Sequence, residues 1–86
     1  MKYTQHTLDK LEEILGEVHY VVRYERGTFQ SGYCILEQKK VVVLNKFLQL
    51  EGRISTLMDI IPKLIDNPGA LSPEARKTFE QIHVKA

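Results

Sequence analysis

Four consecutive apolar residues, Val41 to Leu44, constrain the fold more than any other stretch of this chain. The run is too short for a helix, and three of its four residues are valines, which favour extended backbone. It therefore predicts a strand that is buried on both faces or nearly so. Because such a strand needs neighbours, the rest of the chain must supply a sheet around it and a cover for that sheet.

Two further strands are expected before this run. Val18 to Glu25 is rich in β-branched and aromatic residues and alternates between a mainly apolar side and a second side. A turn at Arg26-Gly27-Thr28, where glycine can adopt a positive φ, leads into a second strand over Phe29 to Glu37. Gln38-Lys39-Lys40 forms the next turn, which is placed by the apolar stretches on either side. We expect the three strands to pair as an antiparallel meander.

Helices are expected before and after these strands. Apolar residues recur at helical spacing from Thr4 to Gly16, with Thr7 as the expected cap. A longer apolar stripe from Leu50 to Ile65 predicts the main core helix, and Pro62 predicts a kink or break just before it. Ser72, followed by a proline, begins a short last helix. The expected fold class is α+β in the order α-β-β-β-α-α, with the first two helices on one face of the sheet.

This arrangement leaves the second face of the sheet without a cover, since one layer of helices shelters only one face. The apolar side chains on that second face are those of Val21, Cys34, Leu36 and one side of the Val41 to Leu44 run. Either the C-terminal segment folds across them, or a second copy of the chain does. The sequence therefore predicts a non-enzymatic protein-interaction module that forms a homodimer.

The composition is that of an ordinary globular chain. Its 86 residues are 43% hydrophobic and 27% charged, so we expect one folded domain rather than a disordered or membrane-embedded chain. The net charge of +1 gives no strong overall field for nucleic acid or anionic lipid. With a polar N-terminal stretch, no long apolar run and a single cysteine, a cytoplasmic location is expected.

No pattern of catalytic or metal-binding residues stands out. His6, His19 and His83 fall in separate predicted elements, and none lies beside Cys34 or an acid at the spacing of a zinc site. Cys34, in a strand of alternating apolar residues, is expected to act as a small buried hydrophobe rather than a nucleophile. We therefore expect no enzymatic activity, no metal and no cofactor.

Two sets of residues are candidates for ligand contact. Tyr20 to Arg26 interleaves aromatic and cationic side chains, which can build a pocket for a base or an anion, or simply a half-buried strand whose Arg23 and Glu25 pair. The residues expected around a small molecule are Tyr20, Arg23, Tyr24 and Tyr33. Those expected to contact RNA or DNA are Arg23, Arg26, Lys39, Lys40 and Lys46. Asn45, directly after the buried strand, is expected to be a turn or cap residue.

The order helix, three strands, helix resembles that of the double-stranded RNA-binding domain. That family places a cluster of lysines at the start of its last helix, where this chain has Glu51-Gly52-Arg53. The resemblance implies nucleic-acid binding through a local patch formed by Lys39, Lys40, Lys46 and Arg53.

A second resemblance covers Gly32 to Leu64, within which the sequence reads GYCILEQKKVVVLNKFLQLEGRISTL. This stretch resembles the hairpin that leads into the active-site helix of the ImmA/IrrE-type zinc metallopeptidases. In place of that family's His-Glu-x-x-His motif, the chain continues with Met58-Asp59-Ile60-Ile61-Pro62-Lys63, so zinc-dependent hydrolysis is not implied. As a whole, with its Tyr-x-x-Arg-Tyr-Glu strand and Gly-x-Cys hairpin, the chain also resembles small bacterial proteins of unknown function.

Overall fold

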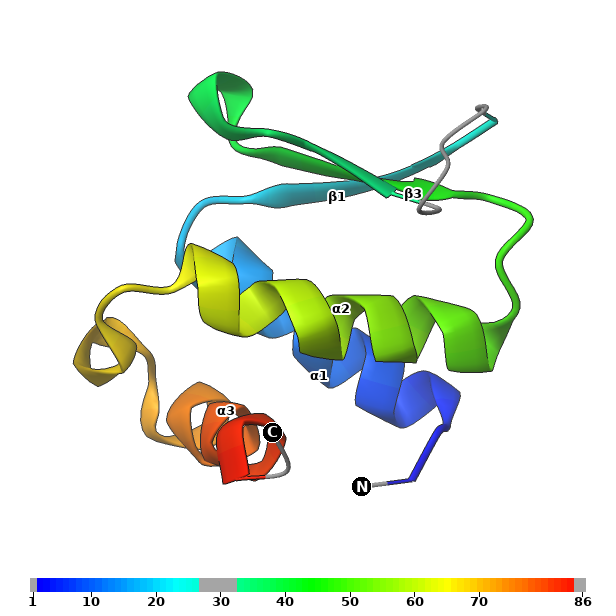
Figure 1. Ribbon diagram of the computed structural model, residues 1–86. Helices are drawn as coiled ribbons and strands as arrows, with labels where there is room; N and C mark the ends of the chain where they lie inside the picture. Colours follow the sequence, from blue (N-terminus) through cyan, green and yellow to red (C-terminus); the bar gives the residue numbers. More distant parts are fainter. Residues whose placement is uncertain (1, 27–32, 85–86) are drawn as a thin grey trace.

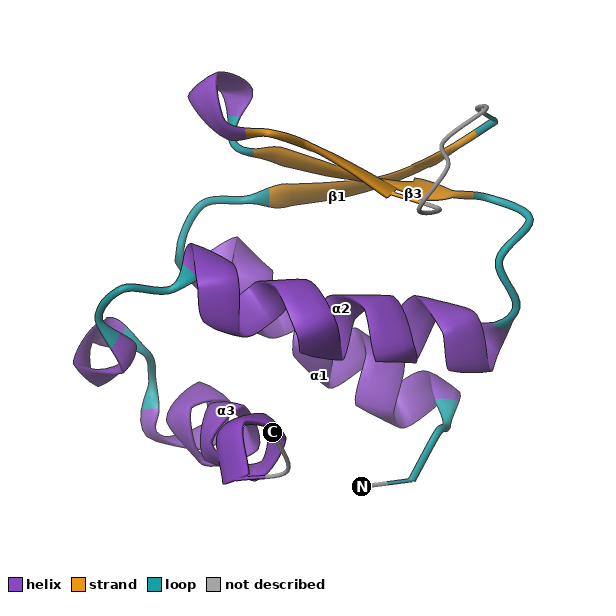
Figure 2. Ribbon diagram, viewed as in Figure 1, coloured by secondary structure: helices purple, strands orange, loops and turns teal. Residues whose placement is uncertain are grey.

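The computed structural model describes residues 2–26 and 33–84, and at 83 and 84 the backbone only. It is built in three layers: a sheet, a pair of helices packed on one face of that sheet, and a third helix beyond the pair (Figures 1 and 2). None of the described helices is long and apolar enough to cross a membrane. The regular elements are α1 (Gln5–Glu17), β1 (Val21–Glu25), β2 (Tyr33–Leu36), η1 (Glu37–Lys39), β3 (Val41–Asn45), α2 (Leu50–Leu64), η2 (Pro68–Ala70) and α3 (Pro73–Val84).

The α+β class is confirmed, but the antiparallel meander is wrong. The sheet is mixed, with the strand order β1-β3-β2, in which β3 pairs in parallel with β1 and antiparallel with β2. The strands point up, down and up in chain order, as they would in a meander. What differs is that β3, rather than β2, occupies the middle of the sheet.

The apolar character of β3 accounts for its central position. Val42 and Leu44 are completely buried, and Val43, which points the opposite way, is only 7% exposed. In the middle of the sheet the strand has hydrogen-bonded neighbours on both sides, which shields such side chains better than an edge position does. Strand β1 begins at Val21 rather than at the predicted Val18, and β2, Tyr33–Leu36, ends one residue before the predicted Glu37. The predicted start of that second strand at Phe29 and the expected turn at Gly27 and Thr28 fall outside the described residues.

The turn before β3 uses a residue type that the sequence did not single out. After the short 3₁₀ turn η1, Lys40 adopts a left-handed conformation with φ 54°, a geometry that usually favours glycine or asparagine. The Lys40 carbonyl then accepts a hydrogen bond of 2.9 Å from the amide of Val21. This bond joins the start of β1 to the start of β3.

The first helix begins earlier than its expected cap. The Thr4 hydroxyl accepts a 3.3 Å hydrogen bond from the amide of Thr7, so Thr4 is the N-cap of α1 and the prediction of Thr7 was wrong. Thr7 is itself buried within the first turn. The helix then runs one residue past Gly16, to Glu17, and buries its apolar stripe of Leu8, Leu11, Ile14 and Leu15.

The main core helix does not break at its proline. Helix α2 continues through Pro62 to Leu64, and the amide of Ile65 still donates to the carbonyl of Ile61. Because Pro62 lies in the last turn, its missing amide costs one hydrogen bond close to the helix end. Ile60 and Ile61, both completely buried, hold this turn against the core.

The C-terminal helix packs on the far side of the helical pair. As predicted, Ser72 caps α3, since its hydroxyl accepts a 3.2 Å hydrogen bond from the amide of Ala75. Phe79 and Ile82 are buried against the rest of the core, and α3 contacts α1 and α2 (Figure 1). The C-terminal segment therefore does not cover the second face of the sheet, and that alternative is wrong for the described residues.

Candidate functional site

The sheet presents a second face that points away from all three helices, which we call the outer face. Val42 and Leu44 of β3 belong to the core, so alternation along each strand places their neighbours on the opposite side. The residues of the outer face are Val21, Arg23, Glu25, Cys34, Leu36, Val41, Val43 and Asn45.

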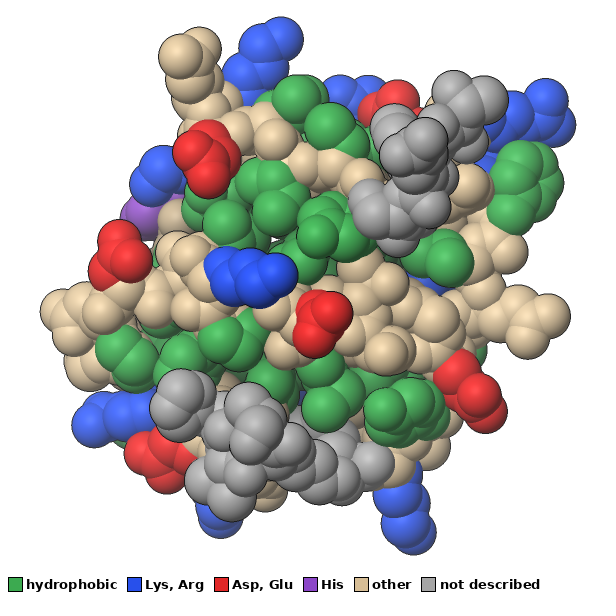
Figure 3. All heavy atoms as spheres, viewed as in Figure 1, with side chains coloured by type: hydrophobic (Ala, Val, Ile, Leu, Met, Phe, Trp, Pro, Cys, Tyr) green, Lys and Arg blue, Asp and Glu red, His purple; other side chains and the backbone are tan. Residues whose placement is uncertain are grey.

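The outer face is apolar at one end and polar at the other. Val21, Val41 and Leu36 form one row across the three strands, and Cys34 and Val43 extend it in the next row. Val21 is 56% exposed and Leu36 is 42% exposed. Figure 3 views the molecule from the side, with the sheet uppermost, and shows hydrophobic side chains at the surface near the level of the sheet with lysine and arginine side chains projecting around them.

The polar end of the outer face carries an ion pair. The Arg23 Nε lies 2.9 Å from a carboxylate oxygen of Glu25, and both side chains are well exposed. The pairing that the sequence offered as one reading of this strand is thus present. Such an exposed pair contributes little to stability on its own.

A rigid turn follows β3 at this polar end. The Asn45 side chain accepts a 3.0 Å hydrogen bond from the amide of Phe47, and its carbonyl accepts another of 3.0 Å from the amide of Leu48. The amide of Lys46 donates to the carbonyl of Glu25, which ties the turn to the end of β1. Asn45 is therefore a turn residue, as predicted, and the turn holds the Phe47 ring 67% exposed.

Arg53 on α2 fixes the same turn from the other side. Its guanidinium donates to the carbonyls of Leu48 and Lys46, both at 2.9 Å, and lies 4.5 Å from the centre of the Tyr24 ring. The Tyr24 hydroxyl in turn donates to Glu12, and burial, followed by this hydrogen bond, raises the pKa of Tyr24 well above its usual value. Arg53, expected in a phosphate-binding patch, thus acts as a positioning residue for the turn.

The five cations predicted to contact nucleic acid are not gathered in one patch. Arg26 and Lys46 lie beside Phe47, each with its charged group 5.7 Å from the ring centre. Lys39 and Lys40 precede β3 and so lie at its opposite end, roughly 17 Å away for a strand of five residues. Arg23 lies between the two groups, on the outer face.

The residues predicted to surround a small molecule are also divided. Tyr20, Tyr24 and Tyr33 are half-buried and pack against the core, on the helix side of the sheet. Arg23 is on the other side, with its charge next to Glu25. The structure therefore does not bring Arg23 together with the three tyrosines. Cys34 is half-buried on the outer face, opposite Val43.

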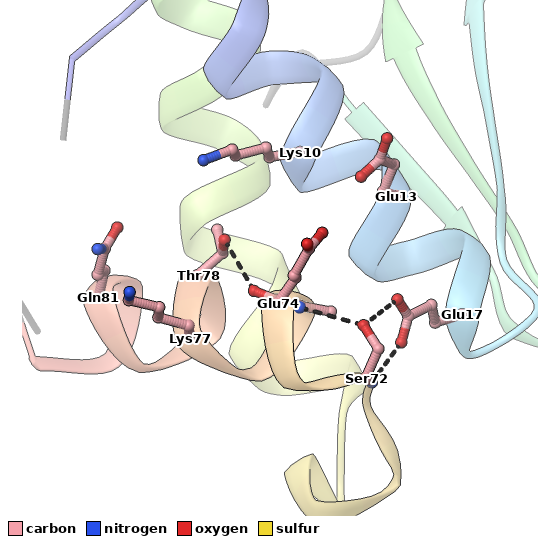
Figure 4. Close-up of a pocket in the computed structure, with 9 residues that line it drawn as sticks. Lys10, Glu13, Glu17, Ser72, Glu74, Lys77, Thr78 and Gln81 are labelled. Carbon is pink, nitrogen blue, oxygen red and sulfur yellow. Dashed lines mark hydrogen bonds between the residues drawn. The ribbon is translucent and has the colours of Figure 1, made fainter.

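A polar groove of about 490 Å³ separates α1 from α3 (Figure 4). Both Ser72 polar groups, the amide and the hydroxyl, donate to the Glu17 carboxylate at 2.7 Å. The amide bond, and then the hydroxyl bond, lower the pKa of Glu17. Lys10 and Lys77 face the same groove, so its charges are mixed and it selects no ligand by charge. Within the described residues, no group of three histidine, cysteine or acidic side chains is placed to hold a metal.

Phe47 is the part of this surface that the sequence did not predict, although Arg26 and Lys46 beside it were among the residues expected to contact nucleic acid. The signal available in the sequence was Asn45 as a turn residue, followed directly by a lysine and an aromatic residue. The approach of Arg26 to that aromatic residue depends on β1 lying next to β3, which the expected meander did not contain.

Comparison with known proteins yields no relative. The chain matches no protein-family model, no curated protein and no solved structure. A function must therefore be inferred from the two surfaces described above, the outer face and the turn that carries Phe47.

Proposed function

We propose that this chain is a protein-interaction module that forms a homodimer through the outer face of its sheet. The observation that carries the proposal is the continuous row of aliphatic side chains across all three strands, exposed at Val21 and Leu36 and half-buried at Val41. Single exposed aliphatic side chains are common on protein surfaces, whereas a row that crosses a whole sheet is typical of an interface.

The size of this row sets the expected affinity. Burying the exposed half of Val21 and of Leu36 gains about 1 kcal/mol each, or about 4 kcal/mol for the four side chains of two copies. The loss of translational and rotational freedom on association costs at least about 4 kcal/mol. Contacts from Cys34, Val41 and the polar end must therefore supply the net affinity. We expect a weak dimer, with a Kd in the micromolar range.

The charges at the polar end favour a second copy of the chain as the occupant. In a two-fold symmetric contact the same surface patch faces itself. Arg23 of one copy then lies opposite the region that holds Glu25 of the other, so the two ion pairs can exchange partners without burying an unpaired charge. The outer face is in this sense complementary to itself.

The first test is sedimentation equilibrium over a range of concentrations, with surface variants. Leu36→Asp places a charge in the row at an exposed position, and we expect it to abolish the dimer while leaving the fold intact. Tyr3→Asp is the matched control, because Tyr3 is 44% exposed but lies outside the sheet. A wild-type chain that sediments as a monomer up to several hundred micromolar contradicts the proposal, and so does an equal loss of the dimer in both variants.

The second test uses the single cysteine of the chain as a reporter. Cys34 lies on the outer face opposite Val43, so a short bismaleimide should link two copies into a covalent dimer. Leu36→Asp should prevent this product and Tyr3→Asp should not. Cys34→Ser, which lacks the thiol, measures the background. A cross-linking yield that is the same in Leu36→Asp as in the wild type shows that the contact lies elsewhere.

A further inference from the structure

We infer that the turn after β3 is a binding site for single-stranded nucleic acid, in which a base stacks on Phe47 while Arg26 and Lys46 contact the adjoining phosphates. This site is separate from the aliphatic row of the outer face. It rests on the exposure of one aromatic ring, on the two cations beside that ring and on the rigidity of the turn.

The exposed ring is held in place rather than left free. Among the large hydrophobic side chains that the structure describes, Phe47 is the most exposed, at 67%. The side chain of Asn45 and the guanidinium of Arg53 both bind the backbone of its turn. A ring presented to solvent on a fixed backbone can stack on a ligand with little further loss of conformational freedom.

The two cations give the site its preference for an anionic ligand with a flat ring. The charged groups of Arg26 and Lys46 each lie 5.7 Å from the centre of the Phe47 ring. A nucleotide offers a π-face for the ring and a phosphate for each cation, and this combination of an aromatic platform with basic side chains is how single strands are bound. Acidic residues nearby reduce the local field, since Glu25 ends β1 and Glu51 lies in the first turn of α2. We therefore expect modest affinity, in the micromolar range.

The open position of Phe47 favours a single strand over a duplex or a free nucleotide. The Phe47 ring is 67% exposed and does not line the groove between α1 and α3, so the described residues do not enclose a mononucleotide there. In a duplex the faces of the bases are already stacked and unavailable to a side chain. A flexible single strand can lay one base on the ring and a phosphate on either side of it.

The test measures binding of the full chain to a labelled oligothymidylate of about 15 nucleotides by fluorescence anisotropy at low salt. Phe47→Ala should weaken binding about tenfold, and Phe47→Trp should retain or strengthen it, because stacking requires an aromatic ring. Arg26→Gln and Lys46→Gln should each remove about one phosphate contact. The slope of log K against log salt, roughly −1.4 for two contacts in the wild type, should fall to about half that value in either variant.

The controls separate stacking from simple charge attraction. Leu36→Ala removes an exposed hydrophobic side chain on the outer face, and Lys63→Gln removes an exposed charge near the end of α2, so neither should change binding. An abasic oligomer of the same length keeps every phosphate and should bind about tenfold more weakly. Circular dichroism and thermal melting show whether each variant is folded.

Three results would overturn the inference. The first is equal binding of the abasic and the base-containing oligomers, and the second is unchanged binding by a folded Phe47→Ala variant. The third is the absence of binding by the wild-type chain at low salt, which would point to Phe47 as an anchor for a protein partner instead. Since Leu36→Asp leaves the Phe47 turn intact, its oligomer binding reports on this site even where the homodimer proposal fails.

Discussion

Replacing Arg53 by lysine tests whether one side chain holds the turn that presents Phe47. The substitution keeps the positive charge and removes the planar guanidinium. In the wild type this group donates to the carbonyls of Leu48 and Lys46 at 2.9 Å and lies 4.5 Å from the centre of the Tyr24 ring. A lysine ammonium cannot make both hydrogen bonds and lie over the ring from the same position.

The expected loss of stability follows from these three contacts. A hydrogen bond from a charged donor is worth about 1.5 kcal/mol at the lower end, and the partial exposure of Arg53 reduces that value to about 0.8. Two such bonds and a cation–π contact of about 1 kcal/mol give roughly 2.5 kcal/mol, of which lysine can recover about 0.5. A net loss of about 2 kcal/mol corresponds to a fall in Tm of roughly 10 °C for a domain of this size.

Urea denaturation of Arg53→Lys and of the wild type measures this difference. Hydrogen exchange then localises it, because the amides of Phe47 and Leu48 should lose protection before those of the core. Arg76→Lys, an exposed substitution on α3, is the control, and we expect it to change the free energy of unfolding by less than about 0.5 kcal/mol. If Arg53→Lys is equally neutral, the backbone bonds made by Asn45 hold the turn and the role assigned to Arg53 is wrong.

Three further substitutions test individual contacts. Glu17→Gln removes a carboxylate whose pKa is lowered by its two hydrogen bonds from Ser72, and should lower the stability by about 0.5 kcal/mol after allowance for screening. In the wild type this contribution is complete above the ordinary carboxyl pKa and is lost as the pH falls through the lowered pKa, so urea denaturation along a pH series should show the two proteins converge in acid. Lys40→Asn should raise the stability by about 0.5 kcal/mol in thermal melts, because asparagine tolerates the φ of 54° better than lysine does. Pro62→Ala should stabilise the chain by about 1 kcal/mol, since it restores the missing amide bond in α2, and a lower Tm would show that packing of the proline ring matters more.

Local signals in the sequence were enough to find most elements. The run from Val41 to Leu44 became β3, the apolar stripe from Leu50 became α2, and Ser72 caps α3 as expected. Each of these signals depends on neighbours within a few residues. The wrong choice of Thr7 as the N-cap of α1 also came from relying on local signals. Thr4 and Thr7 are equivalent as cap residues, and only the burial of Thr7 in the folded chain distinguishes them.

Strand order, by contrast, is not a local property. The strand β1 has one apolar side, and β2 carries Cys34 and Leu36 on one side and Tyr33 and Ile35 on the other, so either can occupy an edge or the middle of a sheet with helices on one face. The sequence of β3 did indicate the strand order, since a strand that is apolar and buried on both sides fits the middle of the sheet best. The expectation that consecutive strands pair, which usually holds, outweighed it.

The same error hid the Phe47 site. In a meander β1 and β3 would also finish at the same end of the sheet, but β2 would lie between them and hold the two strands about 9.6 Å apart. With β3 in the middle this distance is about 4.8 Å, so Arg26 at the end of β1 reaches the ring of Phe47 after β3. The residues of the outer face, in contrast, follow from alternation along each strand and do not depend on strand order.

Salt provides one experiment in which the two proposals predict different results. Residues 18–49 hold five basic and two acidic residues, a net charge of +3, whereas the rest of the chain carries −2. The outer face itself holds only the Arg23–Glu25 pair and so carries no net charge, and the exchange of partners between two copies leaves these charges paired; added salt should therefore change the dimer little. The same salt should weaken oligonucleotide binding at Phe47, because it reduces the gain from counterion release. A dimer that weakens steeply with salt would contradict the face-to-face contact, since it would indicate attraction between the basic sheet of one copy and the acidic α1 of another.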